Sequence, residues 1–145
     1  MYTLLGDPAH VIAYPAGTVD IEVEVSDLQA GEDVRACVQV HGPPEGRALV
    51  TFETDRDVIG FNLAPWEMDD SDRDEVVLAN YALAIDKVTE QWEGDYSGGG
   101  FGVAFPTSRA HTGSLHIRVY VWQEELDAFG SADVRVRAPA PEEAE

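Results

Sequence analysis

Residues 18–25, TVDIEVEV, constrain the fold more than any other stretch, because apolar and polar side chains alternate there without a break. The apolar positions are Val19, Ile21, Val23 and Val25, and the acids between them are Asp20, Glu22 and Glu24. A period of two is that of a β-strand with one face buried and the other in water. Side chains of one face stand about 6.6 Å apart along such a strand. The three acids are therefore expected to form a straight row on the outer face.

Two more stretches alternate as regularly, and they predict two more strands. Residues 34–41 place Val34, Ala36, Val38 and Val40 on one face, and residues 115–122 do the same with Leu115, Ile117, Val119 and Val121. Less regular runs predict the remaining strands at 47–54, 57–63 and 133–137, with a short first strand or hairpin over 2–5 and 10–14. Because GPPEG at 42–46 has the composition of a turn, it predicts a hairpin that pairs 34–41 with 47–54.

Residues 76–92 fit two periods. Val77, Tyr81, Ile85, Val88 and Trp92 would share one face of a helix capped by Ser71 or Asp72, whereas Val77, Ala79, Tyr81, Leu83 and Ile85 would share one face of a strand. We favour the strand, because strands surround the segment on both sides. A helix at 74–92 is the alternative.

The rest of the chain has the composition of loops. Residues 94–102, GDYSGGGFG, predict a flexible loop, 101–105 lead into a turn at 106–108, and 123–129 predict one turn of helix that ends at Gly130. Residues 67–75, EMDDSDRDE, are almost wholly acidic and must be exposed. We expect an all-β fold, an antiparallel β-sandwich or open barrel of about eight strands, as a single β domain over 1–137 followed by an acidic flexible tail at 138–145.

The charge balance limits the partners that such a domain can have. The chain has 28 Asp and Glu against 9 Lys and Arg, a formal net charge of −19 and a pI near 4.2. Direct nucleic acid binding depends on Lys and Arg at phosphates and is therefore disfavoured, whereas a basic protein partner is favoured. The alternative is that the acids serve solubility alone, in a salt-rich cytoplasm or through the base composition of the genome.

Cysteine content and hydropathy bear on the compartment. Cys37 is the one cysteine, so no intramolecular disulfide can form. Nothing near the start resembles the basic region and long apolar run of a secretory signal peptide, and no apolar run approaches the roughly 20 residues that cross a bilayer. We therefore expect a cytoplasmic protein with no membrane role.

The motifs of common catalytic and metal sites are incomplete. Asp70, Asp72 and Asp74 have the spacing that opens a calcium loop, but Glu75 and Tyr81 stand where that loop needs Gly and Glu. The glycines at 98–100 lack the Lys-Ser or Lys-Thr of a phosphate-binding loop, and no Gly-x-Ser-x-Gly elbow is present. The histidines and Cys37 show no metal-ligand spacing. We expect no enzyme activity, no metal and no cofactor.

Protein binding is the function that these residues favour. Its candidate residues are acids and aromatics that a purely soluble surface would not need. The acids are Asp20, Glu22 and Glu24 and, in the segment 69–75, Asp69, Asp70, Asp72 and Asp74; the aromatics are Trp66, Tyr120 and Trp122, with Trp92 and Tyr96 as further exposed rings. For any one tryptophan, burial in a second face or under a loop is the favoured alternative. Alternatively, Arg118, Arg135 and Arg137 could neutralise the acids of residues 18–25 across the sheet, and we expect this in part.

A small acidic β domain of this kind is similar to bacterial immunity proteins and nuclease inhibitors, which meet basic enzymes with carboxylate-rich surfaces. The strand pattern that ends in GSLHIRVYVW, residues 113–122, resembles that of the inhibitor of the DNA-entry nuclease of competent bacteria. The resemblance implies a non-enzymatic inhibitor of a basic partner, such as a nuclease. The alternative is a structural or assembly subunit, of a phage-like particle or a homo-oligomer, in which the aromatics make subunit contacts.

Overall fold

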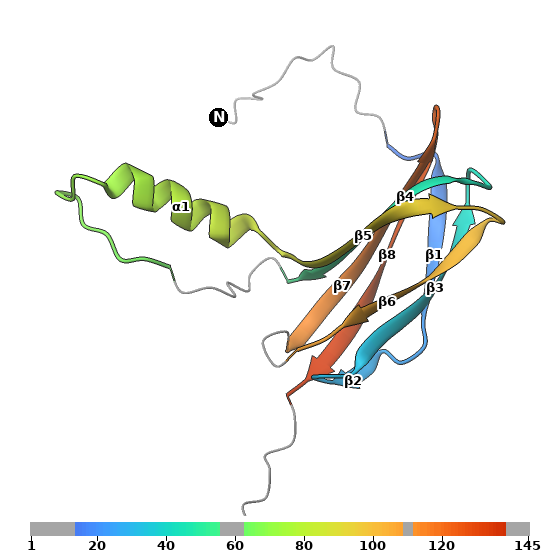
Figure 1. The fold of residues 1–145 in the computed structure, drawn as a ribbon, viewed down its shortest axis with the longest axis horizontal. Helices are drawn as coiled ribbons and strands as arrows, with labels where there is room; N and C mark the ends of the chain where they lie inside the picture. Colours follow the sequence, from blue (N-terminus) through green and yellow to red (C-terminus); the bar gives the residue numbers. More distant parts are fainter. Residues whose placement is uncertain (1–13, 56–62, 109–111, 139–145) are drawn as a thin grey trace, which may run out of the picture.

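The computed structural model describes residues 14–55, 63–108 and 112–138. In this part of the chain, strands and one helix follow one another as Figure 1 shows. They are β1 (Gly17–Val23), β2 (Asp27–Gln29), β3 (Asp33–His41), β4 (Gly46–Thr54), α1 (Arg73–Ile85), β5 (Val88–Tyr96), β6 (Gly100–Pro106), β7 (Gly113–Gln123) and β8 (Leu126–Arg137).

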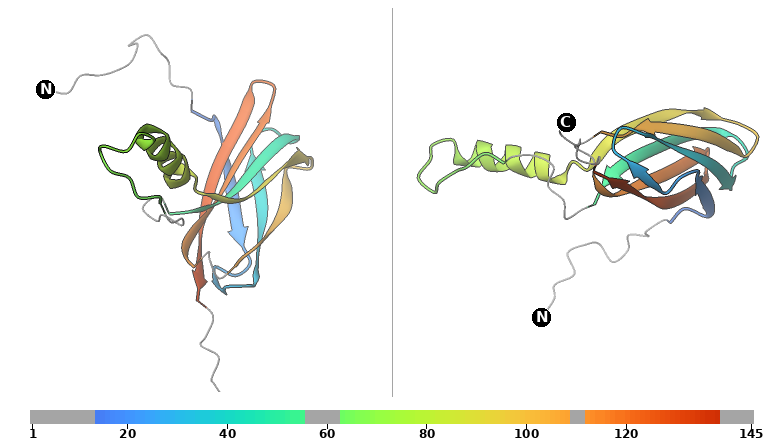
Figure 2. Two further views of the ribbon diagram at one scale, coloured as in Figure 1. Left: turned by 60° about the vertical axis from the view of Figure 1, so that its left-hand side comes forward. Right: turned by 90° about the horizontal axis from the view of Figure 1, so that it is seen from below.

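The strands form one mixed sheet that curves into a nearly closed barrel (Figure 2). The order along the sheet is β5-β4-β7-β8-β1-β3-β6, and β2 pairs with β8. The predicted β fold of about eight strands is confirmed, in its barrel form. The sheet is mixed, not wholly antiparallel, because β1 and β2 follow one edge of β8 in the same direction as β8.

The core lies between the inward faces of the strands. Val50 and Phe52 of β4 and Ile117 and Val119 of β7 are wholly buried, since these strands lie well inside the sheet. The Phe105 ring of β6 stacks on that of Phe52, with centroids 5.6 Å apart, so the far end of the sheet also fills the interior. Each buried side chain of this size contributes about 1.5–3 kcal/mol.

The three regular alternations are confirmed as β1, β3 and β7. The inward side chains of β3 and β7 named above are buried, except Val40, which is half-buried. The strand predicted at 18–25 is shorter than expected: β1 ends at Val23, and Val25 is 52% exposed. After Val23 the chain leaves β3 and moves toward β8, where β2 begins. Glu24 N still donates to Arg35 O of β3 (2.9 Å), whereas Ser26 O accepts from Arg135 N of β8 (2.8 Å).

The strand at 47–54 is confirmed as β4, but its predicted pairing with 34–41 is wrong. The neighbours of β3 are β1 and β6, and those of β4 are β5 and β7, so both edges of each strand are already occupied. Residues 42–46 therefore link separate parts of the sheet. Pro43 is buried in this link, and its carbonyl accepts a hydrogen bond of 2.7 Å from the Tyr96 hydroxyl.

The strand favoured at 76–92 is wrong over 76–85, where the helical alternative is the one that forms. α1 covers Arg73–Ile85, with Asp72 at the N-cap and Asp74 and Glu75 in the first turn, where the helix dipole favours acids. Ala and Leu, which are strong helix formers, occupy much of its second half. The predicted helix is also too long at its end, because residues 88–92 belong to β5.

Two segments predicted as a loop and a helical turn are strands joined by tight turns. Residues 94–102 form the end of β5 and the start of β6, linked by Gly98 and Gly99, both at φ +74°. Residues 123–129 form the end of β7, the turn at 124–125, in which Glu124 has φ 51°, and the start of β8; the strand predicted at 133–137 is the second half of β8. Glycine adopts positive φ at little steric cost, so a glycine run fits a hairpin as well as a loop.

Three expectations lie wholly or mainly outside the described residues. They are the strand or hairpin over 2–5 and 10–14, the strand over 57–63 and the tail over 138–145.

Candidate functional site

The acidic row, Asp20, Glu22 and Glu24, lies along and just beyond β1, and all three side chains are exposed. Asp20 makes a 2.7 Å ion pair with His41 Nε2 of the neighbouring strand β3. Among the described residues, Glu22 and Glu24 form no ion pair. The outward exposure of the row is as the alternation predicted.

The expected neutralisation of the acidic row by arginines is wrong. Arg118 Nη1 lies 3.3 Å from Glu53 Oε2, and Arg137 pairs with Asp27, with a 2.7 Å hydrogen bond from Nε. These hydrogen bonds hold the pKa of Asp27 below its ordinary value. Strand pairing explains why these arginines have other partners. Arg135 and Arg137 lie on the part of β8 that pairs with β2, and Arg118 lies on β7, whose neighbours are β4 and β8 and not β1.

A second acidic surface lies on residues 63–87, which we call the arm. In Figures 1 and 2 the arm projects beyond the end of the barrel, and α1 lies along it. The arm has seven acids and two bases. Every residue from 63 to 72 is exposed, as predicted for the acidic segment, and so are Asp74 and Glu75. The candidates on the arm are Asp69, Asp70, Asp72, Asp74 and Trp66, whose side chain is 44% exposed.

Hydrogen bonds order the arm without a core beneath it. The Asn80 amide of α1 holds the opposite segment at both backbone groups of Ala64: Asn80 Nδ2 donates to Ala64 O (2.8 Å), and Ala64 N donates to Asn80 Oδ1 (2.9 Å). Near the tip, Glu67 N donates to Asp70 Oδ2 (2.7 Å). At the barrel, Thr54 N donates to Lys87 O (2.9 Å), which joins the arm to β4.

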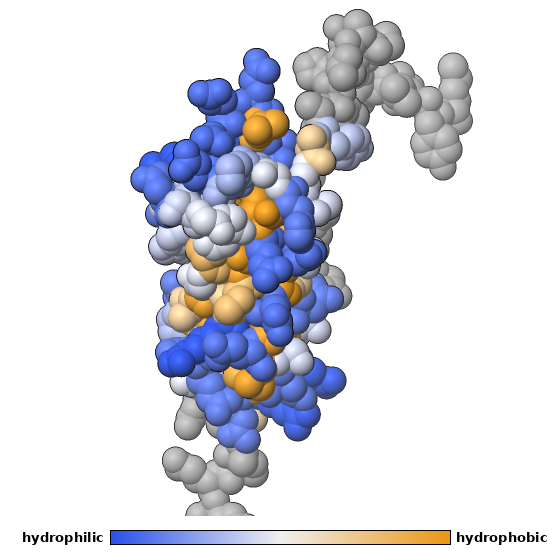
Figure 3. Space-filling view, turned by 90° about the vertical axis from the view of Figure 1, so that its right-hand side faces the viewer, coloured by the Kyte–Doolittle hydropathy of each residue, from blue (hydrophilic) through white to orange (hydrophobic). Residues whose placement is uncertain are grey.

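α1 presents apolar side chains to solvent. Among the described residues nothing covers them: none of its residues is buried, and Leu78, Tyr81 and Ile85 are 68%, 63% and 57% exposed. The barrel exposes fewer apolar side chains on the face that Figure 3 shows, where they form a narrow stripe between hydrophilic ones. The sequence placed Tyr81 and Ile85 on one face of the segment but could not show whether that face is covered, because tertiary cover cannot be read from a helical period.

The predicted aromatics divide between the barrel surface and its interior. Tyr120 and Trp122 lie on the outer face of β7, with ring centroids 5.4 Å apart. The register places Leu49 and Phe129 on either side of Tyr120, and Phe129 is 43% exposed. We call this set the aromatic patch: Leu49, Tyr120, Trp122 and Phe129. Leu49 and Phe129 were missed because strand pairing brings them to the site.

Tyr96 was wrongly expected to be exposed, and Trp92 follows the alternative of burial that the sequence left open. Trp92 is half-buried, Tyr96 is 6% exposed, and both rings pack on Phe101 with centroids 5.4 and 5.5 Å apart. They lie on β5, which reaches β6 through the short turn at 97–99, so their rings fill the space between these two ends of the sheet.

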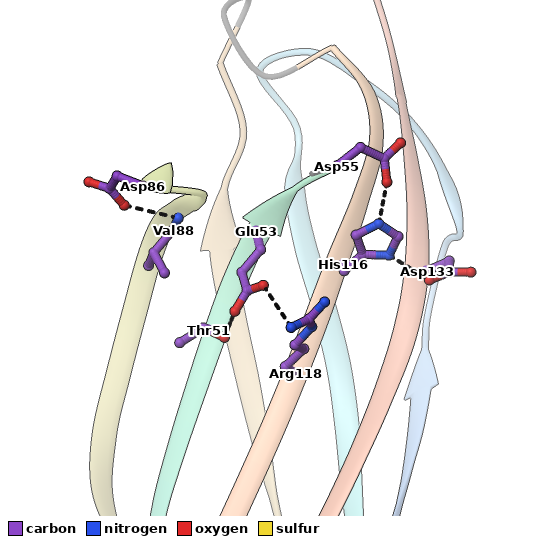
Figure 4. Close-up of polar contacts among 8 residues, drawn as sticks. All are labelled: Thr51, Glu53, Asp55, Asp86, Val88, His116, Arg118 and Asp133. Atoms are coloured by element: carbon purple, nitrogen blue, oxygen red, sulfur yellow. Dashed lines mark hydrogen bonds and ion pairs between the residues drawn. The ribbon is translucent and has the colours of Figure 1, made fainter. Parts of the chain in front are cut away.

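A histidine held by two carboxylates stands where the arm joins the barrel (Figure 4). His116 of β7 binds Asp133 of β8 through Nδ1 at 2.7 Å and Asp55, just after β4, through Nε2. The hydrogen bonds to Asp55 and then to Asp133 raise the pKa of the imidazole, and partial burial opposes them. Nearby, Glu53 accepts from Thr51 (2.7 Å) and pairs with Arg118.

A cleft of about 500 Å³ opens beside this cluster, between the end of α1 and the barrel. It is lined by Glu53, Ala84, Ile85, Asp86, Lys87, Val88 and Arg118. Its lining carries both signs of charge, so it does not favour an ionic ligand of either sign, and we regard it as the contact region between the arm and the barrel.

Within the described chain, no group of three or more His, Cys, Asp or Glu could hold a metal ion. Over the same residues, no helix has the length and apolar character needed to cross a membrane.

No protein-family model and no curated protein matches the chain. Solved structures match its fold. The alpha-2-macroglobulin of Escherichia coli, activated by porcine elastase, matches 89% of this chain with 13% identity and a TM-score of 0.53. The sporulation control protein Spo0M of Bacillus subtilis matches 87% with 13% identity and a TM-score of 0.49. The chain spans 13% of the first protein and 51% of the second.

Proposed function

We propose that the protein is a non-enzymatic binding protein that engages a basic protein partner, such as a nuclease, through the arm. The observation that carries the proposal is the arm itself. It projects from a barrel that is already packed, and it combines exposed acids with exposed apolar side chains.

The stability of α1 supports this proposal. Isolated helices shorter than about 12–15 residues are marginal in water, and most helices depend on packing of an apolar face. α1 has 13 residues, and no described residue buries any of its side chains. A partner that covers α1 would supply that packing, so the arm has the properties of a binding element.

The charge indicates the kind of partner. Acids outnumber bases on the arm by seven to two, and the whole chain has a net charge of −19. A basic surface is attracted to such a protein at long range, and an acidic one is repelled. The acidic row on β1 extends this field to the barrel, where it serves as a second contact.

A second function, an assembly subunit, is favoured by the aromatic patch on the outer face of β4, β7 and β8. Exposed aromatic side chains next to one another are typical of subunit contacts. Size-exclusion chromatography separates the two functions, because a monomer is expected of the binding protein and a defined oligomer of the assembly subunit.

Two neutralised variants test the main proposal. The arm variant carries Asp69→Asn, Asp70→Asn, Asp72→Asn and Asp74→Asn; the row variant carries Asp20→Asn, Glu22→Gln and Glu24→Gln. The wild type and the two variants are immobilised separately and exposed to native lysate at low salt. The proteins that each retains are then eluted at high salt. We expect a basic protein on the wild type, less of it on the row variant and least on the arm variant. Equal retention by all three would exclude the arm as the binding surface.

A further inference from the structure

We propose that the stripe Leu78, Tyr81 and Ile85 of α1 inserts into an apolar groove on the basic partner, and that Lys and Arg side chains rim this groove. The inference rests on the proposed function and names how its partner is recognised. An amphipathic helix laid in a groove is a recurring mode of recognition, with anchors at such spacings.

The spacing of the three residues places them on one side of the helix. Tyr81 is three and Ile85 seven residues after Leu78, and both intervals return to nearly the same side of an α-helix. These are also the most exposed large apolar side chains of α1, at 68%, 63% and 57%.

The other side of α1 is already occupied. Arg73, Val76, Asn80 and Ala84 are half-buried, and the Asn80 amide binds Ala64 of the opposite segment. This contact fixes which side of the helix faces away. The stripe is thus ordered before binding, which lowers the entropy lost on association.

The acids beside the stripe set the chemistry of the groove. Asp74 lies four residues before Leu78 and so on the same side, and Glu75 is next to it, with both exposed. Asp69, Asp70 and Asp72 continue the acidic surface toward the tip of the arm. The basic rim of the groove is therefore expected to meet the N-terminal half of α1, which fixes the direction in which the helix lies.

Charge argues against a second copy of this chain as the occupant. Two arms that packed against each other through their stripes would each bring seven acids and two bases into the contact. Like charges in close contact across an interface strongly disfavour it. A basic groove removes this repulsion and covers the same apolar stripe.

The first step of the test finds what touches the stripe. A photo-crosslinking residue, p-benzoylphenylalanine, replaces Tyr81 in the full chain. The control chain carries it in place of Leu126, the first residue of β8, which is 57% exposed. In native lysate we expect the Tyr81 position, but not the Leu126 position, to give an adduct with a protein of net positive charge. An adduct with a second copy, with an acidic protein, or with nothing would overturn the inference.

The second step uses the purified crosslinked protein as the probe, with wild type, Leu78→Ala, Tyr81→Ala, Ile85→Ala and the control Leu126→Ala. Alanine keeps the helix, because it is the strongest helix former. We expect Kd to rise about tenfold or more for each stripe variant, as for buried anchors, and to stay unchanged for the control. The rise should be the same at low and high salt, since it reflects apolar burial.

A charge variant separates this inference from the proposed function. Asp74→Asn with Glu75→Gln should weaken binding at low salt and flatten the dependence of Kd on salt, because rim charges are screened. If this variant and the arm variant weaken binding while the three alanine variants do not, the groove is wrong and the proposed function stands. If no variant of the arm alters binding, both are wrong.

Discussion

His116 shows how one residue joins three adjacent strands. It lies on β7 and binds Asp133 on β8 and Asp55 after β4, so its imidazole connects the barrel to the point where the arm begins. A protonated imidazole can donate to both carboxylates at once, which a neutral ring cannot. The raised pKa of His116 follows from these two hydrogen bonds.

The pKa of His116 makes part of the stability depend on pH. Because the folded pKa is above the ordinary value of 6.5, the stabilisation is complete below about pH 6 and is lost as the pH rises through the folded pKa. His116→Gln should therefore lower the free energy of unfolding by roughly 1 kcal/mol at pH 6 and by less at pH 8. Urea denaturation at both pH values measures this. A difference that does not change with pH would refute the assignment, and His41→Gln, in an exposed pair with Asp20, is the control.

Val119 tests the strand register at a single position. Its side chain is fully buried at the centre of β7, so Val119→Asp would place an unpaired charge in the core and should cost more than about 4 kcal/mol. Val23→Asp should cost less, because Val23 at the end of β1 is only half-buried. Glu22→Lys on the outer face should change stability by no more than about 0.5 kcal/mol. Circular dichroism during thermal unfolding compares the three, and a normally folded Val119→Asp variant would show that the register is wrong.

At the scale of elements, the sequence predicted strands better than their partners. β1, β3 and β7 each have one face in the core and one in water, so alternation alone identifies them. The pairing of β3 with β6, and of β4 with β7, joins segments far apart in the chain, and no local pattern carries that information. The same limit explains why Trp92 and Tyr96 were placed outside the core.

The helix was missed for a related reason. Residues 76–85 fit both periods, and the surrounding strands favoured the wrong one. Isolation from the barrel decides the outcome, because a strand at this place would have no partner for its backbone groups, whereas a helix satisfies its own. Local structure thus follows from a tertiary fact, the projection of the arm.

Asn80 tests how the arm is ordered. Asn80→Ala removes both hydrogen bonds to Ala64 while it raises the intrinsic helix propensity of α1. We expect the Ala64 amide to exchange with deuterium faster, and the melting temperature of the barrel to change by no more than about 2 °C, because Asn80 lies outside the core. Hydrogen exchange followed by mass spectrometry measures the Ala64 amide, and thermal unfolding measures the melting temperature of the barrel. Unchanged exchange at Ala64 would mean that other contacts hold the arm.

At the scale of the whole molecule, the candidate site was predicted in part. The acids of the row and of the arm could be named from the sequence, since acids so dense must be exposed. The stripe on α1 could not, because Leu78, Tyr81 and Ile85 are site candidates only if nothing covers them. Leu49 and Phe129 joined the aromatic patch only through strand register.

Net charge and local contact should act on different rate constants. With a formal charge of −19, association with the captured basic protein should slow at least about tenfold between about 50 mM and 500 mM salt, as the screening length shortens. The arm variant should lower the association rate at low salt, whereas Tyr81→Ala should raise the dissociation rate at every salt concentration, because buried contacts act mainly on dissociation. Surface plasmon resonance across the salt series measures both. An association rate that is flat with salt would show that the charge serves solubility alone.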